Sequence, residues 1–216
     1  EAARISQKAV DEVLPTLKPG VTELQVVGKV LEVLYREGAE YEGLPQYILA
    51  GENAAGAISR ATHRRIEEGD PFLFGTSARV CGYSSSVQRP ACMGKMSPEI
   101  RDMVQFGFKA HNKTAEMMEA GVPASEVAIE YEEWVKEQGY ADKMLYGPCH
   151  GTGLIEVERP WMETSSDYDL KPNMTFQVDT FFHTPEFGAR WEDGVRITED
   201  GVDKFTWADE PIIELT

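Results

Sequence analysis

The chain has 216 residues, of which 42% are hydrophobic, enough to bury the core of a globular protein. Its 21 Lys and Arg residues against 37 Asp and Glu residues give a formal net charge of −16. This charge argues against nucleic-acid and anionic-membrane partners, which are bound through clustered basic residues. The 3 cysteines are odd in number and form no Cys-x-x-Cys pair, which favours a cytoplasmic location without disulfides.

The first half of the chain predicts two helices followed by a strand. Residues 2–17 carry apolar side chains at helical spacing, and residues 20–38 form a second helical stretch between two glycines. Thr22 and Gln25 have the spacing of a capping box, and Gly38 stands where the helix should end. Residues 71–80, with their aromatic and β-branched side chains, predict a strand.

The second half predicts the same elements in the same order. Residues 99–119 have helical spacing and follow Ser97 and Pro98, which suit the N-cap and the first helical position. Residues 121–139 predict a second helix and residues 174–182 a strand. His111 falls within the first of these helices, where we expect it at the surface.

The two halves also agree position by position, which indicates a duplication. Residues about a hundred positions apart match in character, as Val26 does with Val127 and Glu32 with Glu133. We therefore predict an α+β fold with helix-helix-strand halves at about 1–97 and 98–216, related by a pseudo-two-fold axis. Their strands would share one sheet, with the helices packed outside. A single domain over 1–216 is the expectation, and two small separate domains are the alternative.

Four segments, in order, resemble the signature motifs of one enzyme family. Residues 82–89 (Gly-Tyr-Ser-Ser-Ser-Val-Gln-Arg) parallel the pattern Gly-Tyr-x-Ser-Asp-x-Thr-Arg, and residues 150–160 contain His-Gly-Thr-Gly-Leu followed by Glu-Arg-Pro. Residues 171–176 parallel a Pro-Gly-Met-x-Phe turn, and residues 190–198 parallel the strand Arg-x-Glu-Asp-x-Val-x-Val-Thr. The chain thus resembles the pita-bread (peptidase M24) family of methionine aminopeptidase, aminopeptidase P, prolidase and creatinase.

The resemblance implies the pita-bread fold, a curved, antiparallel-rich sheet covered by helices. Prolidase-type and creatinase-type members carry an additional N-terminal domain and usually form dimers. The resemblance therefore implies a homodimer, with the preceding N-terminal domain absent from this chain. No apolar run reaches the roughly 20 residues of a membrane helix, so no membrane partner is expected.

The metal ligands of the family fall on an incomplete set of residues. Family members hold two metal ions with two Asp, one His and two Glu, an arrangement that polarises a carbonyl and generates hydroxide. The two Asp positions fall on Gly75 and Ser86, which offer no carboxylate. His150 and Glu192 match the family, and Asp179 stands in place of a glutamate. We therefore expect no metal pair and no cofactor, although a single divalent ion on His150, Asp179 and Glu192 remains possible.

The accessory histidines of the family are replaced as well. The histidine that contacts substrate in the peptidases and serves as acid/base in creatinase falls on Ile58, and a second one falls on Val157. Since crowded carboxylates raise one another's pKa and hold a neighbouring His protonated, the remaining polar residues suit acid/base catalysis. We expect His150, Asp179 and Glu192 to be catalytic. Further residues are expected to contact substrate: Ile58, Gly75, Tyr83, Ser86 and His183.

Three functions follow from these expectations. The first is a metal-independent hydrolase of a C–N or related bond in a small amino-acid-derived compound. The second is a non-catalytic domain that binds a ligand or peptide, and the third is an Xaa-Pro aminopeptidase or dipeptidase with one residual metal ion. In each case the partner would be a small molecule or a short peptide.

Overall fold

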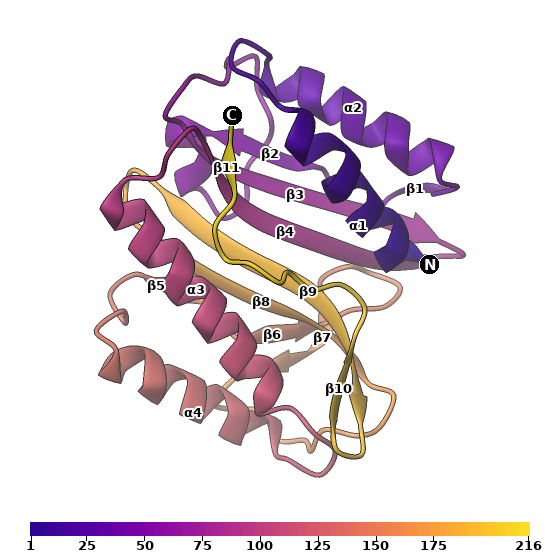
Figure 1. Ribbon diagram of the computed structural model, residues 1–216. Coiled ribbons are helices and arrows are strands. Elements are labelled where there is room, and N and C mark those ends of the chain that lie inside the picture. The colour runs from indigo at the N-terminus through magenta and orange to yellow at the C-terminus, as the bar shows by residue number, and fades with distance from the viewer.

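The computed structural model describes residues 1–216, and its two halves repeat one order of elements (Figure 1). The first half contains two helices and two long strands: α1 (Ala2–Val13), α2 (Glu23–Arg36), β3 (Pro71–Val80) and β4 (Tyr83–Met93). The second half contains their counterparts: α3 (Pro98–Glu116), α4 (Ala124–Glu137), β8 (Thr175–His183) and β9 (Gly188–Thr198). The predicted helices and strands are thus confirmed to within a few residues.

Shorter elements complete each half. The first half adds two short strands and two 3-10 helices: η1 (Leu14–Thr16), β1 (Tyr41–Glu42), β2 (Tyr47–Ala50) and η2 (Gly51–Ala55). The second half adds five short strands: β5 (Met144–Tyr146), β6 (Cys149–Gly151), β7 (Glu158–Met162), β10 (Gly201–Lys204) and β11 (Glu214–Leu215). No helix is both long and apolar enough to cross a lipid bilayer.

All the strands belong to one 11-stranded sheet with the order β1-β3-β4-β9-β8-β6-β7, to which β2, β5, β10 and β11 pair at the side. The two halves meet where β4 pairs antiparallel with β9. Every pairing is antiparallel except that of β11 with β4. In Figure 1 the helix pair α1 and α2 covers the strands of the first half, and α3 and α4 cover those of the second. The predicted α+β pita-bread fold is confirmed.

The helix ends follow the local signals in the sequence. The Thr22 hydroxyl accepts from the Gln25 amide at 3.2 Å, and the Gln25 side chain accepts from the Thr22 amide at 2.8 Å, which is the predicted capping box. The Ser97 hydroxyl accepts from the Ile100 amide at 3.3 Å. Gly38 stands at φ 97° just after α2, in the left-handed region that stops a helix.

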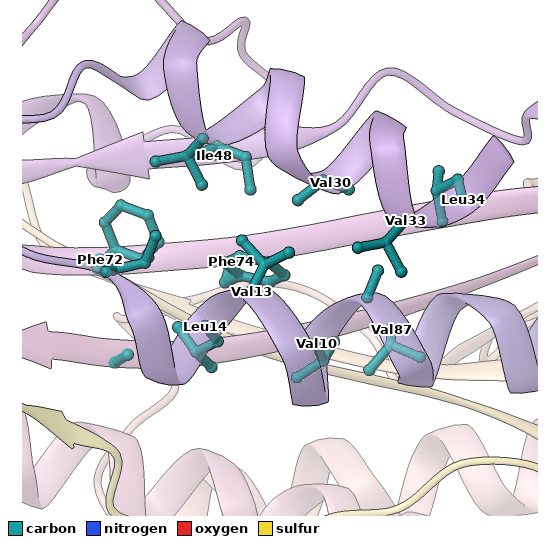
Figure 2. Close-up of a cluster of buried hydrophobic side chains, with 14 of the residues drawn as sticks. Val10, Val13, Leu14, Val30, Val33, Leu34, Ile48, Phe72, Phe74 and Val87 are labelled. Atoms are coloured by element: carbon teal, nitrogen blue, oxygen red, sulfur yellow. The ribbon is translucent and has the colours of Figure 1, made fainter. Parts of the chain in front are cut away.

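Alternation along the strands separates a helix-covered face from a helix-free face. In Figure 2, Phe72 and Phe74 of β3 pack with Val87 of β4 against Val13 and Val30 of the helices. Successive strand residues point to opposite faces. The residues next to these apolar positions along each strand therefore point to the helix-free face. They include the candidate site positions 75, 86 and 88.

Beneath α3, on the helix-covered face, lies a buried ion cluster. Arg89 donates to both carboxylate oxygens of Asp193 at 2.7 and 3.0 Å, and His111 Nε2 lies 3.0 Å from Asp193 Oδ2. The predicted surface position of His111 is wrong, since only 1% of it is exposed. The reason is helical spacing: His111 lies seven residues after Val104, on the α3 face that packs on the sheet.

This cluster makes stability depend on pH. Burial lowers the pKa of His111. Just below about pH 6.5, this side chain is therefore protonated in the unfolded chain but neutral in the folded protein. Burial alone would raise the pKa of Asp193, but the charge of Arg89 and the hydrogen bond from His111 hold it below its usual value. The contribution of Asp193 is therefore present above about pH 3.9 and is lost as the pH falls through its lowered pKa.

We expect the free energy of unfolding to fall as the pH drops below about 6.5, with His111 contributing up to about 1.4 kcal/mol per pH unit. Urea denaturation between pH 8 and pH 5 measures this slope. In a His111→Gln variant the slope should be smaller, because the replacement cannot titrate. An unchanged slope would show that His111 does not cause it.

Candidate functional site

A row of directly paired residues crosses five strands on the helix-free face. Tyr47 of β2 pairs with Gly75 of β3, and Gly75 pairs with Gln88 of β4. Gln88 pairs with Glu192 of β9, which pairs with Asp179 of β8. Side chains of directly paired residues lie about 4.5–5.5 Å apart on one face. The topology therefore brings residues that are more than a hundred positions apart into one polar site.

Arg190 is the central cation of the site. It precedes Glu192 by two residues, so both side chains point to the same face of β9. Its Nε and Nη2 donate to the two oxygens of Asp179 at 2.8 and 2.7 Å, and Nη2 lies 3.2 Å from Glu192 Oε2. Nη1 donates one of its two hydrogens to the Ala57 carbonyl at 3.1 Å. The second hydrogen can be donated to a ligand. Burial alone would lower the pKa of Arg190, but the Asp179 charge raises it well above its usual value.

His150 presents an open acceptor nitrogen. Its Nδ1 lies 3.0 Å from the Gly151 carbonyl oxygen, which can only accept, so Nδ1 carries the hydrogen and Nε2 the lone pair. Nε2 is buried, has no hydrogen-bond partner and lies 3.8 Å from Asp179 Oδ2. Ligand atoms of His150, Asp179 and Glu192 lie within 4.8 Å of one another.

Behind these residues, Ser86 links two buried carboxyl groups. Its Oγ lies 2.5 Å from Glu156 Oε1, contacts Glu192 Oε1 and accepts from Gln177 Nε2 at 3.1 Å. A hydroxyl has one hydrogen and so can donate to only one of the two carboxyls. The other carboxyl must carry a proton and donate to Oγ. In agreement, burial and the Glu156 charge raise the pKa of Glu192 well above its usual value.

A cavity of about 370 Å³ opens onto part of this network. The charged and ionisable residues His150, Asp179, Arg190 and, at the exposed rim, Glu163 line it, and most of the wall is apolar, including Tyr146 and Trp161. Glu192, Ser86 and Glu156 do not line it and are at most 1% exposed. A ligand in the cavity would therefore contact His150, Asp179 and Arg190, with the linked carboxyls enclosed beneath them.

The structure brings together most of the predicted site residues. Ile58 lines the cavity, and Gly75 and Ser86 belong to the enclosed network. Tyr83 and His183 are apart from it. Tyr83 stands at the start of β4, is 60% exposed and lines a different hollow. His183 shares the face of Asp179 but lies four residues farther along β8, about 13 Å away at strand spacing.

Three residues of the polar network were not predicted as site residues: Arg190, Gln88 and Glu156. Arg190 and Gln88 fall inside quoted motifs, where nothing in one sequence reveals their contacts. Glu156 lies between Ile155 and Val157, and a lone acid among apolar residues is the signal that could have pointed to a buried carboxyl.

Comparison with known proteins identifies the family of the chain. Residues 1–199 match the description "Metallopeptidase family M24". The chain belongs to family M24. A Xaa-Pro dipeptidase of Pyrococcus furiosus is 28% identical over 214 residues, covering 99% of this chain and 62% of that protein. An uncharacterized peptidase of Bacillus subtilis, YqhT, is 26% identical over 100% of this chain and 61% of its own length.

Solved structures of family M24 members have the same fold. The prolidase from Pyrococcus furiosus superimposes with a TM-score of 0.92 at 28% identity, covering 97% of this chain and 62% of that one. The Xaa-Pro dipeptidase from Bacillus anthracis gives a TM-score of 0.94 at 26% identity, covering 99% and 61%. The chain thus spans about three fifths of the length of these M24 relatives.

Two of the positions expected to bear metal ligands offer no carboxylate in this M24 chain. Gly75 has no ligand atom, and Ser86 offers a hydroxyl that is already bonded to Glu156 and Glu192. A single ion would find the open Nε2 of His150, but Arg190 occupies both oxygens of Asp179 and one of Glu192. A cation at this group would lie beside the guanidinium, whose positive charge opposes it.

Proposed function

We propose that the chain is the hydrolytic domain of an enzyme that cleaves a C–N bond in a small amino-acid-derived compound or short peptide without a pair of metal ions. One observation carries the proposal: Arg190 occupies the carboxylates of Asp179 and Glu192, while His150, which lines the cavity, has no hydrogen-bond partner at Nε2. The site therefore keeps a base and a fixed cation.

His150 would act as general base and then as general acid. Its Nε2 takes a proton from a water molecule as the water oxygen bonds to the carbon of the scissile C–N bond. The same proton passes from Nε2 to the leaving nitrogen as the C–N bond breaks, so that the histidine ends neutral. Asp179 Oδ2, 3.8 Å from Nε2, stabilises the imidazolium between these steps. Such proton transfer typically contributes about 10²–10⁴-fold to the rate.

Arg190 would stabilise the charge that develops on the substrate oxygen or nitrogen. The second hydrogen of Nη1 is free of the contacts that hold the guanidinium, and Arg190 lines the cavity beside His150. A donor fixed in a buried site stabilises developing charge without reorganising during the reaction. The polar end of the cavity thus offers one donor and one acceptor, which suits an amide or amidine group.

A panel of chelator-treated reactions tests this proposal. The protein is dialysed against EDTA and incubated with Xaa-Pro dipeptides, N-acylamino acids and amidino amino acids, and the products are followed by mass spectrometry. We expect turnover of at least one of these C–N substrates. Absence of turnover from all three classes with EDTA, together with turnover after Mn²⁺ addition, would contradict it.

A second candidate is an Xaa-Pro dipeptidase with a single metal ion. Its support is the name of the Pyrococcus furiosus relative together with the His150, Asp179 and Glu192 group, a donor set that suits divalent iron or similar ions. For this candidate Arg190 must turn away from Asp179. Activity on Xaa-Pro dipeptides only when one ion is bound per chain would favour it.

We further infer a cytoplasmic homodimer, as expected from the sequence. Three free cysteines, two of them buried, suit a reducing compartment.

A further inference from the structure

Gln88 fills the space that an aspartate at position 75 would need. The two residues are directly paired across β3 and β4. A Cβ added at Gly75 would lie 2.8 Å from Gln88 Oε1, closer than real Cβ contacts, and 3.0 Å from the Cβ of Tyr47, tighter than most. A side chain at position 75 therefore requires Gln88 to move.

Gln88 also satisfies one carboxylate oxygen of Glu192. Its Nε2 donates to Glu192 Oε2, the oxygen that also faces Arg190. The other oxygen of Glu192 contacts Ser86. Both oxygens of Glu192 are therefore engaged in hydrogen bonds within the protein.

Glu156 closes the network from the loop between β6 and β7. Its neighbours Leu154 and Ile155 are 58% and 59% exposed, whereas Glu156 is completely buried. Its Oε1 bonds to Ser86 at 2.5 Å, and its Oε2 has no partner in the protein. One carboxyl of an otherwise exposed loop thus points into the floor of the site, where it holds Ser86 against Glu192.

We propose that Gln88 and Glu156 are positioning residues that hold Glu192 by hydrogen bonds and thereby exclude divalent cations from the floor of the site. Glu192 in turn anchors Arg190, which faces the cavity beside His150. This inference rests on the proposed metal-independent function and adds the residues responsible for it.

Mn²⁺ titration by calorimetry tests the inference in four forms of the protein. They are the wild type, the variant Gly75→Asp, the triple variant Gly75→Asp/Gln88→Thr/Glu156→Gln, and the control Gly75→Asp/Gln46→Thr. Ser86 is kept in all four forms, because Glu156 acts on Glu192 through it. Gln46 is a buried amide that bonds to Ser77 and contacts no carboxyl of the site. Circular dichroism verifies that each form is folded.

We expect at least 100-fold tighter Mn²⁺ binding in the triple variant than in Gly75→Asp, and no gain from Gln46→Thr. Equal binding by the triple variant and Gly75→Asp would overturn the role of Gln88 and Glu156 and leave the proposed function standing. Binding of two Mn²⁺ by the wild type would instead overturn the proposed function. If the triple variant does not fold, Gln88→Thr alone should still raise the affinity of the wild type for Mn²⁺ at least 10-fold, and an unchanged affinity would overturn the inference.

Discussion

Replacement of His150 by Gln is expected to lower kcat by about 10²–10⁴-fold, the usual contribution of a positioned acid/base. The amide cannot accept and return a proton, although it keeps the size and hydrogen-bonding capacity of the imidazole. KM should change little, because the walls of the cavity, Tyr146 and Trp161 among them, are untouched. Steady-state kinetics on the substrate found with the chelator-treated protein measures both constants.

His183→Gln is the matched control. This histidine lies at the end of β8, stacks on Phe181 at a centroid distance of 5.8 Å and does not line the cavity. Its replacement should leave kcat within a factor of about two. Equal losses in both variants would indicate a general disturbance of the fold, and full activity in His150→Gln would remove His150 from the mechanism.

Replacement of Arg190 by Met is expected to lower the free energy of unfolding by about 3–5 kcal/mol, the cost of breaking a buried ion pair by removing one partner. Arg190 is 4% exposed and is the cation paired with Asp179 and Glu192, which are 2% and 0% exposed. Methionine fills much of the same volume but leaves these carboxyls without their cation. Urea denaturation followed by circular dichroism measures the change at pH 7.

Arg196→Met on the same strand is the control. Arg196 is paired with Asp203, but the two side chains are 46% and 53% exposed, and an exposed pair contributes about 0–1 kcal/mol. A loss below about 1 kcal/mol in Arg190→Met would mean that the carboxyls are held without the guanidinium. So small a loss would also contradict the electrostatic role assigned to Arg190.

The fold could be predicted because its signals are local and repeated. The capping box at Thr22, the N-cap at Ser97 and the glycines after α2 and α4 each fix a helix end by contacts within a few residues. The repeat then indicated that the strands of the two halves share one sheet. His111 was misplaced because its residue type suggested a surface position, whereas its spacing from Val104 placed it toward the sheet.

The site was only partly predictable, because its contacts cross strands that are distant in the sequence. The motifs pointed to His150, Asp179 and Glu192, and the structure places these three together. Spacing alone could not show that Arg190 spans Asp179 and Glu192, since that depends on the register of β8 with β9. The direction of the Glu156 side chain could not be predicted, because a register shift between His150 and Gly151 precedes its loop.

Gly75 and Gln88 are related by their position in the sheet. The absence of a side chain at Gly75 leaves room for the long amide of Gln88 opposite it. Only the pairing of β3 with β4 reveals this relation. The amide of Gln88 can then reach Glu192 in the hydrogen-bonded carboxyl network.

The most direct test of this account is the hydrolysis rate per chain plotted against the measured metal content of the same sample. Metal is removed by chelation and returned in steps as Mn²⁺ or Zn²⁺, and its content is determined by mass spectrometry of the elements. We expect hydrolysis without metal, at a rate that does not depend on the metal content of the sample. A rate that vanishes without metal and rises in proportion to two ions per chain would contradict it.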